Sequence, residues 1–217
     1  MSTLVETVNL TRSYGSNLAL DSLNLKIPQG AVYGFIGPNG AGKTTTMRIL
    51  TTLLKPTSGE AWIAGHSVLG DKRAVRKVVG FMPDFFGVYD DLRVWEYLDF
   101  FARCYNLPAA QRRTTVEQLL DLVDLTPKRD AFVQSLSRGM QQRLCLAHAL
   151  VHDPPILLLD EPASGLDPRA RVELREDMSE VAPIEEALSI LSPDIGLLDF
   201  SSGRRSAARL GLFDEDA

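Results

Sequence analysis

Eight consecutive residues constrain the fold of this chain more than any other part of its sequence. Residues 37–44 read Gly-Pro-Asn-Gly-Ala-Gly-Lys-Thr, between an apolar run at 31–36 and a helix-like stretch at 42–54. Gly37 and Gly42, separated by four residues and followed by Lys-Thr, match a common phosphate-binding pattern. A strand buried on both faces before the loop and a helix after it supply the context that this pattern requires. The alternative is an ordinary glycine-rich turn.

The residue types in this loop suit phosphate chemistry. Gly40 and Gly42 allow the backbone to curl so that successive N–H groups point at one anion, aided by the helix N-terminus. Lys43 adds a mobile positive charge for the β- and γ-phosphates, and the Thr44 hydroxyl can bind Mg²⁺. The sequence therefore predicts a nucleotide site whose other contacts are Gly37, Pro38, Asn39, Ala41 and Thr45.

A second constellation follows a short apolar run at 156–159. Asp160 and Glu161 stand at the end of this predicted strand, where ligands bind in open α/β sheets. Asp160 is expected to hold Mg²⁺, and Glu161 to act as the general base that activates water. Taken alone, the two acids could simply mark a strand entering a loop.

The periodicity of the chain predicts an α/β fold with a mainly parallel core sheet. An antiparallel β part lies near the N-terminus, and a helical lobe covers about residues 84–150. The expected strands are 5–10, 18–27, 31–36, 60–64, 78–82 and 156–159, and the expected helices are 42–54, 94–105, 113–123 and 141–151. Leu144, Ala147 and Val151 lie on one side of the last helix and predict its core face.

Further motifs resemble the ABC ATPase family. Residues 136–144, Leu-Ser-Arg-Gly-Met-Gln-Gln-Arg-Leu, resemble its signature sequence and keep Ser137 and Gly139, the positions that contact phosphate, while Arg138 and Met140 depart from it. Residues 163–168 resemble the loop after the catalytic glutamate and include Asp167. Tyr14 stands where the family has an aromatic side chain that stacks on adenine. The resemblance covers about residues 5–175.

This resemblance implies an ATP-binding and ATP-hydrolysing subunit of an ABC transporter, with ATP and Mg²⁺ as cofactors. Two such subunits would sandwich ATP in a head-to-tail homo- or heterodimer. Closure and opening would then move a transmembrane permease subunit, with this chain on the cytoplasmic face of the membrane. The sub-pattern resembles export-type members. A net charge of −5 argues against nucleic acid as the main ligand.

Two departures from the family pattern affect the expected activity. Asp84 stands where the family has a glutamine beside the metal and the attacking water. Either Asp84 binds the metal in place of that glutamine, or it is a solvated acid in a loop. No histidine follows His152 in the sequence given, whereas the family has a switch histidine after the Asp167 loop. A poor ATPase of reduced stability is therefore expected.

The same departures define the expected domain organisation. Residues 1–175 are predicted to form the ABC ATP-binding domain, and residues 176–217 a divergent or truncated tail. Either 187–191 or 195–200 is apolar enough to replace the missing core strand. Two alternative functions remain: a catalytically impaired nucleotide-binding or regulatory subunit, and a soluble non-transport ABC ATPase.

Overall fold

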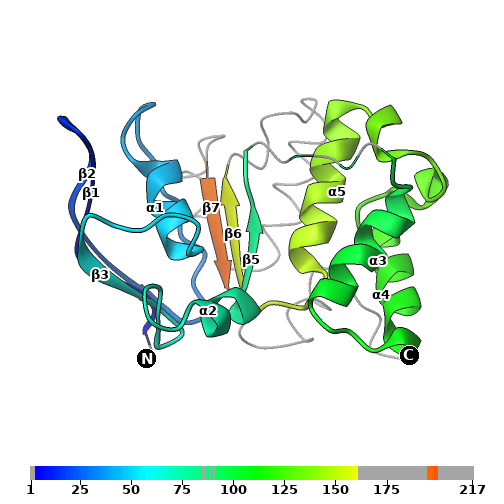
Figure 1. Cartoon of the computed structure of the whole chain (residues 1–217), viewed down its shortest axis with the longest axis horizontal. Coiled ribbons are helices and arrows are strands. Elements are labelled where there is room, and N and C mark those ends of the chain that lie inside the picture. The colour runs from blue at the N-terminus through cyan, green and yellow to red at the C-terminus, as the bar shows by residue number, and fades with distance from the viewer. Residues whose placement is uncertain (1–2, 85–86, 88, 90, 161–194, 200–217) are drawn as a thin grey trace.

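The computed structural model describes residues 3–84, 87, 89, 91–160 and 195–199. Figure 1 shows an N-terminal antiparallel sheet at one end of the molecule, a small core sheet in the middle and a helical lobe at the other end. The predicted α/β architecture with a helical lobe is therefore confirmed. The predicted boundary near residue 175 lies outside the described residues.

The N-terminal sheet has the strand order β2-β1-β3-β4, and all of its pairings are antiparallel. Its apolar side chains Val5, Leu10 and Ile63 are buried in the main hydrophobic core. Val5 and Leu10 are an odd number of residues apart, and an irregularity in the β1 register between Thr7 and Leu10 lets both side chains face the core. The strands are β1 (Thr3–Tyr14), β2 (Asn17–Pro28), β3 (Ser58–Ile63) and β4 (His66–Ser67). This part matches the expected strands at 5–10, 18–27 and 60–64.

The core sheet has the order β5-β6-β7, with β5 (Val79–Met82), β6 (Ile156–Asp160) and β7 (Ile195–Asp199). β5 and β6 run parallel, and every residue of β6 is buried. β7 pairs with β6 in the antiparallel sense, from Ile156 opposite Asp199 to Asp160 opposite Ile195. Of the two tail segments predicted as a substitute strand, 195–200 supplies β7, and 187–191 lies outside the described residues. β7 runs in the opposite direction to a parallel core strand.

The prediction of a doubly buried strand at 31–36 is wrong. The structure forms no β-strand over these residues; Ile36 is 54% exposed, and Tyr33 and Phe35 are only partly buried against the core. A strand is buried on both faces only within a continuous ladder. The described neighbours of β6 are β5 and β7, so residues 31–36 have no place in that ladder.

The helical lobe has its own hydrophobic core. It contains α3 (Val94–Cys104), α4 (Ala109–Leu122), α5 (Arg138–Leu150) and the short 3₁₀ helices η1 (Thr126–Lys128) and η2 (Val133–Ser135). Leu144, Ala147 and Val151 are buried in this core, so the predicted face of the last helix is confirmed. A Cβ atom on Gly80 of β5 would lie 2.3 Å from the carbonyl oxygen of Ala149, so the absence of a side chain allows α5 to approach the core sheet.

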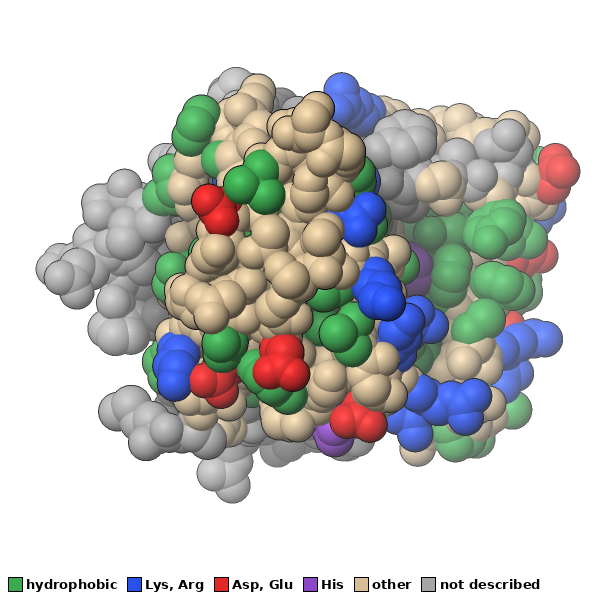
Figure 2. Space-filling view, turned by 60° about the vertical axis from the view of Figure 1, so that its left-hand side comes forward, with side chains coloured by type: hydrophobic (Ala, Val, Ile, Leu, Met, Phe, Trp, Pro, Cys, Tyr) green, Lys and Arg blue, Asp and Glu red, His purple; other side chains and the backbone are tan. Residues whose placement is uncertain are grey.

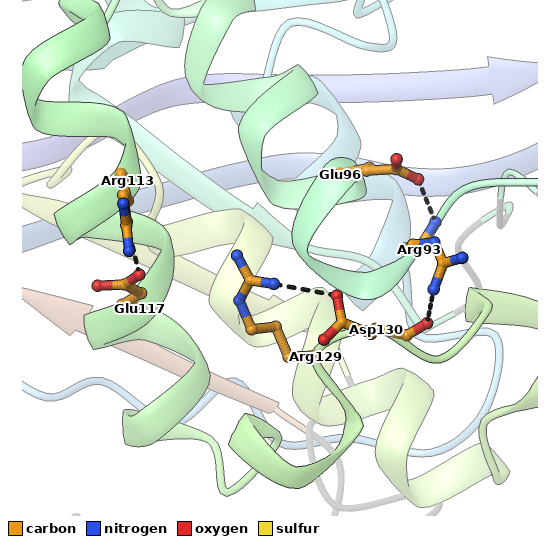
Figure 3. Close-up of polar contacts among 6 residues, drawn as sticks. All are labelled: Arg93, Glu96, Arg113, Glu117, Arg129 and Asp130. Atoms are coloured by element: carbon orange, nitrogen blue, oxygen red, sulfur yellow. Dashed lines mark hydrogen bonds and ion pairs between the residues drawn. The ribbon is translucent and has the colours of Figure 1, made fainter.

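Polar contacts hold the start of α3 against the segment that follows η1. The backbone N–H of Arg93 donates to the Glu96 carboxylate at 2.8 Å, which satisfies a group left free at the helix start. The Arg93 guanidinium donates to the carbonyl of Asp130 at 2.7 Å, and Asp130 also pairs with Arg129 at 3.0 Å (Figure 3). The bond from Arg93 to Asp130 connects residues 37 apart in the sequence, whereas the other two contacts are local.

Two partly buried histidines, His148 and His152, lie where the helical lobe meets the core sheet. The ring of His152 stacks on Tyr105 with centroids 3.8 Å apart, and its Nε2 lies 3.2 Å from the carbonyl oxygen of Val79. Its Nδ1 is buried and has no hydrogen-bond partner among the described residues. Burial lowers the pKa of His152 to about 4, and burial together with His152 lowers the pKa of His148 to about 4.

We predict that acid weakens this junction. In the unfolded chain each histidine binds a proton near its ordinary pKa of about 6.5. Below that pH the unfolded state binds more protons than the folded state, so the free energy of unfolding falls as the pH is lowered from about 6.5 towards about 4. The expected slope is at most about 1.4 kcal/mol per pH unit for each histidine. In urea unfolding, His152→Gln should lose about half of the pH dependence that the two histidines cause. The control His66→Gln leaves His148 and His152 in place and should keep all of it.

Two further helices frame the core sheet. α1 spans Lys43–Leu50, shorter than the helix predicted at 42–54 because Thr52 adopts a positive φ of 64°. α2 spans Lys72–Val78 and was not predicted. Within the described residues, no helix combines the length and the apolar character needed to cross a bilayer.

Candidate functional site: a phosphate loop beside a buried carboxylate

The loop over residues 37–42 folds as the phosphate-binding pattern requires. Gly40 and Gly42 have positive φ values of 85° and 88°, a region that residues with side chains rarely adopt. A Cβ atom on Gly42 would also lie 2.4 Å from the carbonyl oxygen of Ala19. The N–H of Ala41 bonds to the carbonyl of Pro38 at 3.1 Å and closes a turn. Backbone geometry and the contact with β2 therefore both demand glycine at residue 42.

Lys43 begins α1 and is buried. Its ammonium group donates hydrogen bonds to the carbonyl oxygens of Gly37 and Pro38, so the side chain folds back along the loop. This conformation places a positive charge beside the backbone N–H groups of the helix start. The loop thus combines the features of an anion site: a helix N-terminus, glycines with positive φ and a cation.

Thr44 and Asp160 come together although they are 116 residues apart in the sequence. The Thr44 hydroxyl on α1 donates to Asp160 Oδ1 at the end of β6, at 3.1 Å. Asp160 is 1% exposed. A hydroxyl and a carboxylate at this separation are hard oxygen ligands of the type that Mg²⁺ prefers.

Burial and four nearby side chains affect the pKa of the Asp160 carboxyl group. Burial raises the pKa of the Asp160 carboxyl, and the hydrogen bond from Thr44 opposes that rise. Asp84 adds to the rise, whereas Arg48 and Lys43 oppose it. Burial dominates, so the ionised carboxylate is incompletely compensated by the side chains around it. A bound cation would supply that compensation.

Asp84 is exposed and lies just beyond β5. β5 and β6 run parallel with Met82 opposite Leu159, so Asp84 and Asp160 both belong to the carboxyl-terminal edge of the sheet. That edge is where ligands bind in open α/β sheets. The structure therefore brings Asp84 to the same edge as the Thr44–Asp160 pair.

Ser137 forms a second candidate anion site in the helical lobe. It caps α5, and its hydroxyl accepts a hydrogen bond from the Met140 N–H at 3.4 Å. Gly139 lies in the first turn of the same helix. α1 and α5 lie in different parts of the molecule (Figure 1), so the two helix starts do not form one pocket within a single chain.

Tyr14 ends β1 and is 48% exposed. The guanidinium carbon of Arg12 lies 4.5 Å from the centre of its ring. One face of the ring is therefore in contact with a cation, and the stacking of adenine on Tyr14 stays a prediction. Thr45 is half-buried on α1, and Glu161 and Asp167 lie outside the described residues.

One charged side chain near this site, Arg48, was not predicted from the sequence. Arg48 follows Thr44 by four residues, so both lie on one face of α1, and the charge of Arg48 acts on Asp160. The i, i+4 spacing could have indicated it. Only the folded structure, however, brings β6 against that face.

Comparison with known proteins identifies the same family over most of the chain. The family model described as "ABC transporter" matches residues 20–164. The chain is 40% identical over 175 residues to "Bacitracin transport ATP-binding protein BcrA" of Bacillus licheniformis, a match that covers 81% of this chain and 56% of that protein. It is 40% identical over 163 residues to "Daunorubicin resistance ATP-binding protein DrrA3" of Streptomyces coeruleorubidus, covering 75% of this chain and 52% of that one. The chain thus spans about half the length of the curated relatives it matches.

Solved structures agree with this assignment. An ATP-binding subunit of an ABC transporter superposes with a TM-score of 0.71 and 30% identity, covering 82% of this chain and 75% of that one. The dimeric post-hydrolysis cassette MJ0796, bound to ADP and Pi, superposes with a TM-score of 0.71 and 28% identity, covering 82% of each chain. The matched residues include the phosphate loop, the start of α5 and the strand that ends in Asp160. The chain belongs to the ABC transporter family of ATP-binding proteins.

Proposed function

We propose that this chain binds ATP with Mg²⁺ at the phosphate loop and hydrolyses it to drive transport through a separate membrane subunit. The observation that carries the proposal is the 3.1 Å contact between Thr44 and the buried Asp160, next to the Lys43 loop. A phosphate cradle and a pair of magnesium ligands at one edge of a sheet are the two parts that phosphoryl transfer from ATP requires.

Each part of the site has a distinct task. The N–H groups of residues 40–44 and the ammonium of Lys43 neutralise the phosphate oxygens. Thr44 and Asp160 would hold Mg²⁺, which when bound screens the charge on the β- and γ-phosphates. Glu161 accepts a proton from the attacking water as general base. Asp84, just beyond the neighbouring strand β5, would offer a further oxygen ligand at the same edge of the sheet.

Dimerisation would complete the site. Ser137 and Gly139 at the start of α5 offer N–H groups and a hydroxyl to an anion, and they lie apart from the phosphate loop of their own chain. A second copy arranged head to tail would bring this helix start to the far side of the ATP. The solved cassette MJ0796 is dimeric, which supports this arrangement.

The proposed membrane subunit, rather than this chain, would select the transported substrate. Relatives are named for bacitracin transport, daunorubicin resistance and, in Cupriavidus metallidurans, Nod factor export, three chemically different cargoes at the same 40% identity. We therefore assign an export-type motor at the cytoplasmic face of the membrane, held there by a permease. Cargo selection would reside in that permease.

A second candidate is a subunit that binds ATP but turns it over poorly. His152, the last histidine of the sequence given, stacks on Tyr105 and its Nε2 contacts the carbonyl oxygen of Val79. His148 packs on Phe101 with ring centroids 3.7 Å apart. Neither ring is therefore available to contact a γ-phosphate. Measuring ATP turnover beside ATP binding separates this candidate from an active motor.

The Thr44 hydroxyl provides the direct test of the proposed site. Thr44→Val keeps the shape of the side chain and removes the oxygen, so the affinity for ATP in the presence of Mg²⁺ should fall by about tenfold, the equivalent of one charge-assisted hydrogen bond. With EDTA in place of Mg²⁺, calorimetry should give the same affinity for the variant and the unchanged chain. Thr44→Ser restores the hydroxyl and should restore the magnesium effect. Full magnesium dependence in Thr44→Val would contradict the assignment.

A further inference from the structure

The outer face of α2 consists of positively charged side chains. Lys72, Arg73, Arg76 and Lys77 are all exposed, whereas Val75 is fully buried. These spacings place the four cations on one side of the helix. The opposite side packs against β4 and β5. α2 is thus an amphipathic helix whose solvent-facing side is entirely basic over Lys72–Val78.

The ion pairs of the described residues do not include these cations. Arg76 is held in place by a 2.8 Å hydrogen bond from its Nε to the Thr52 hydroxyl, and Asp71 immediately precedes the helix. Figure 2 shows Lys and Arg side chains gathered on this side of the molecule, beside hydrophobic ones. The chain as a whole carries a charge of −5, so this local positive charge stands out against an acidic background.

Two exposed leucines flank the basic helix. Leu53 is 63% exposed and follows Thr52, the residue that Arg76 contacts. Leu69 is 39% exposed and precedes α2 by three residues. Cations attract the anionic headgroups of a bilayer, and neighbouring apolar side chains enter the boundary between headgroups and acyl chains. A nucleic-acid backbone would satisfy the cations but leave both leucines in water.

We propose that this basic face, made of Leu53, Leu69, Lys72, Arg73, Arg76 and Lys77, binds directly to the anionic surface of a lipid bilayer. The contact would fix the orientation of the chain, because the rest of its charge is repelled by such a surface. It needs neither ATP nor a permease. Lys43→Ala should therefore bind vesicles as the unchanged chain does, so failure of lipid binding and failure of the ATP site can be distinguished.

The test is co-sedimentation of the purified chain with vesicles of phosphatidylcholine, with or without phosphatidylserine. The chain should bind the vesicles that contain phosphatidylserine, and added salt should weaken the binding. Each Lys or Arg near such a surface contributes roughly fivefold to binding. The triple variant Lys72→Gln/Arg73→Gln/Lys77→Gln should therefore bind about 100-fold more weakly. It retains Arg76, so its folding and its ATP affinity should be unchanged.

A matched variant controls for total charge. Lys26→Gln/Arg113→Gln/Lys128→Gln removes three exposed cations elsewhere and should bind vesicles as the unchanged chain does. Leu53→Ser/Leu69→Ser should weaken binding to the vesicles while keeping its salt dependence. Three results would overturn the proposal: equal binding to pure phosphatidylcholine, equal loss in both charge variants, or tighter binding to duplex DNA that the α2 triple variant abolishes.

Discussion

ATP turnover should fall by about 10²–10⁴-fold when Glu161 is replaced by glutamine, the range typical of a lost general base. Glutamine has the shape of glutamate but cannot accept the proton of the attacking water. ATP and Mg²⁺ would still be held by the loop, Thr44 and Asp160, so ATP binding should persist. ATP-driven dimerisation should persist or strengthen, because the proposed closed dimer would open only after hydrolysis.

The measurement uses single-turnover release of phosphate together with sedimentation analysis of dimer formation. Glu60→Gln removes an exposed carboxylate from β3 and provides a matched control that should leave both readings unchanged. Unchanged turnover in Glu161→Gln would assign the base to another residue, and Asp84 would be the first to test. If the unchanged chain itself shows no turnover while it binds ATP and dimerises, the impaired subunit is the correct function.

Replacing Lys43 with alanine should weaken the binding of Mg²⁺ and ATP by about 10- to 100-fold. A hydrogen bond to a charged group contributes about 1.5–3 kcal/mol, which corresponds to this range of affinity. In the structure the ammonium bonds to the carbonyl oxygens of Gly37 and Pro38, so it is already positioned over the loop. Its loss removes the cation that begins α1 without altering the glycines that shape the backbone.

Calorimetry of ATP binding provides this measurement, with urea unfolding to show that the variant stays folded. Lys55→Ala removes an exposed lysine a few residues beyond α1 and should bind ATP with unchanged affinity. Equal affinity in Lys43→Ala and Lys55→Ala would remove the assignment of the phosphate site.

Local features of this protein could be predicted from the sequence because their causes are local. The turns of the phosphate loop need glycine at 40 and 42 for positive φ, and this requirement can be recognised in the residue types alone. The same holds for the helix start at Ser137 and for the buried strand that ends at Asp160. The prediction of a phosphate site, the two helix starts and the family all follow from these segments.

Pairings between distant segments could be decided only by the tertiary structure. Residues 31–36 are as apolar as a central strand, yet they form none, because the neighbours of β6 are β5 and a tail strand that runs antiparallel. Apolar composition favours burial, but it does not specify which segment completes a ladder, since any extended backbone offers the same N–H and C=O groups. Which segment pairs with β6 therefore depends on which extended segments the folded chain brings next to it.

The electrostatic surroundings of Asp160 also depend on contacts between segments that are distant in the sequence. The sequence by itself determined that Thr44, Lys43 and Asp160 are suited to ATP and Mg²⁺. Only the fold decided that Arg48 and Asp84 also act on the carboxylate, and that the ring of His152 stacks on Tyr105. Electrostatic interactions and ring stacking depend on distance through space, and for residues this far apart in the chain that distance is set by packing.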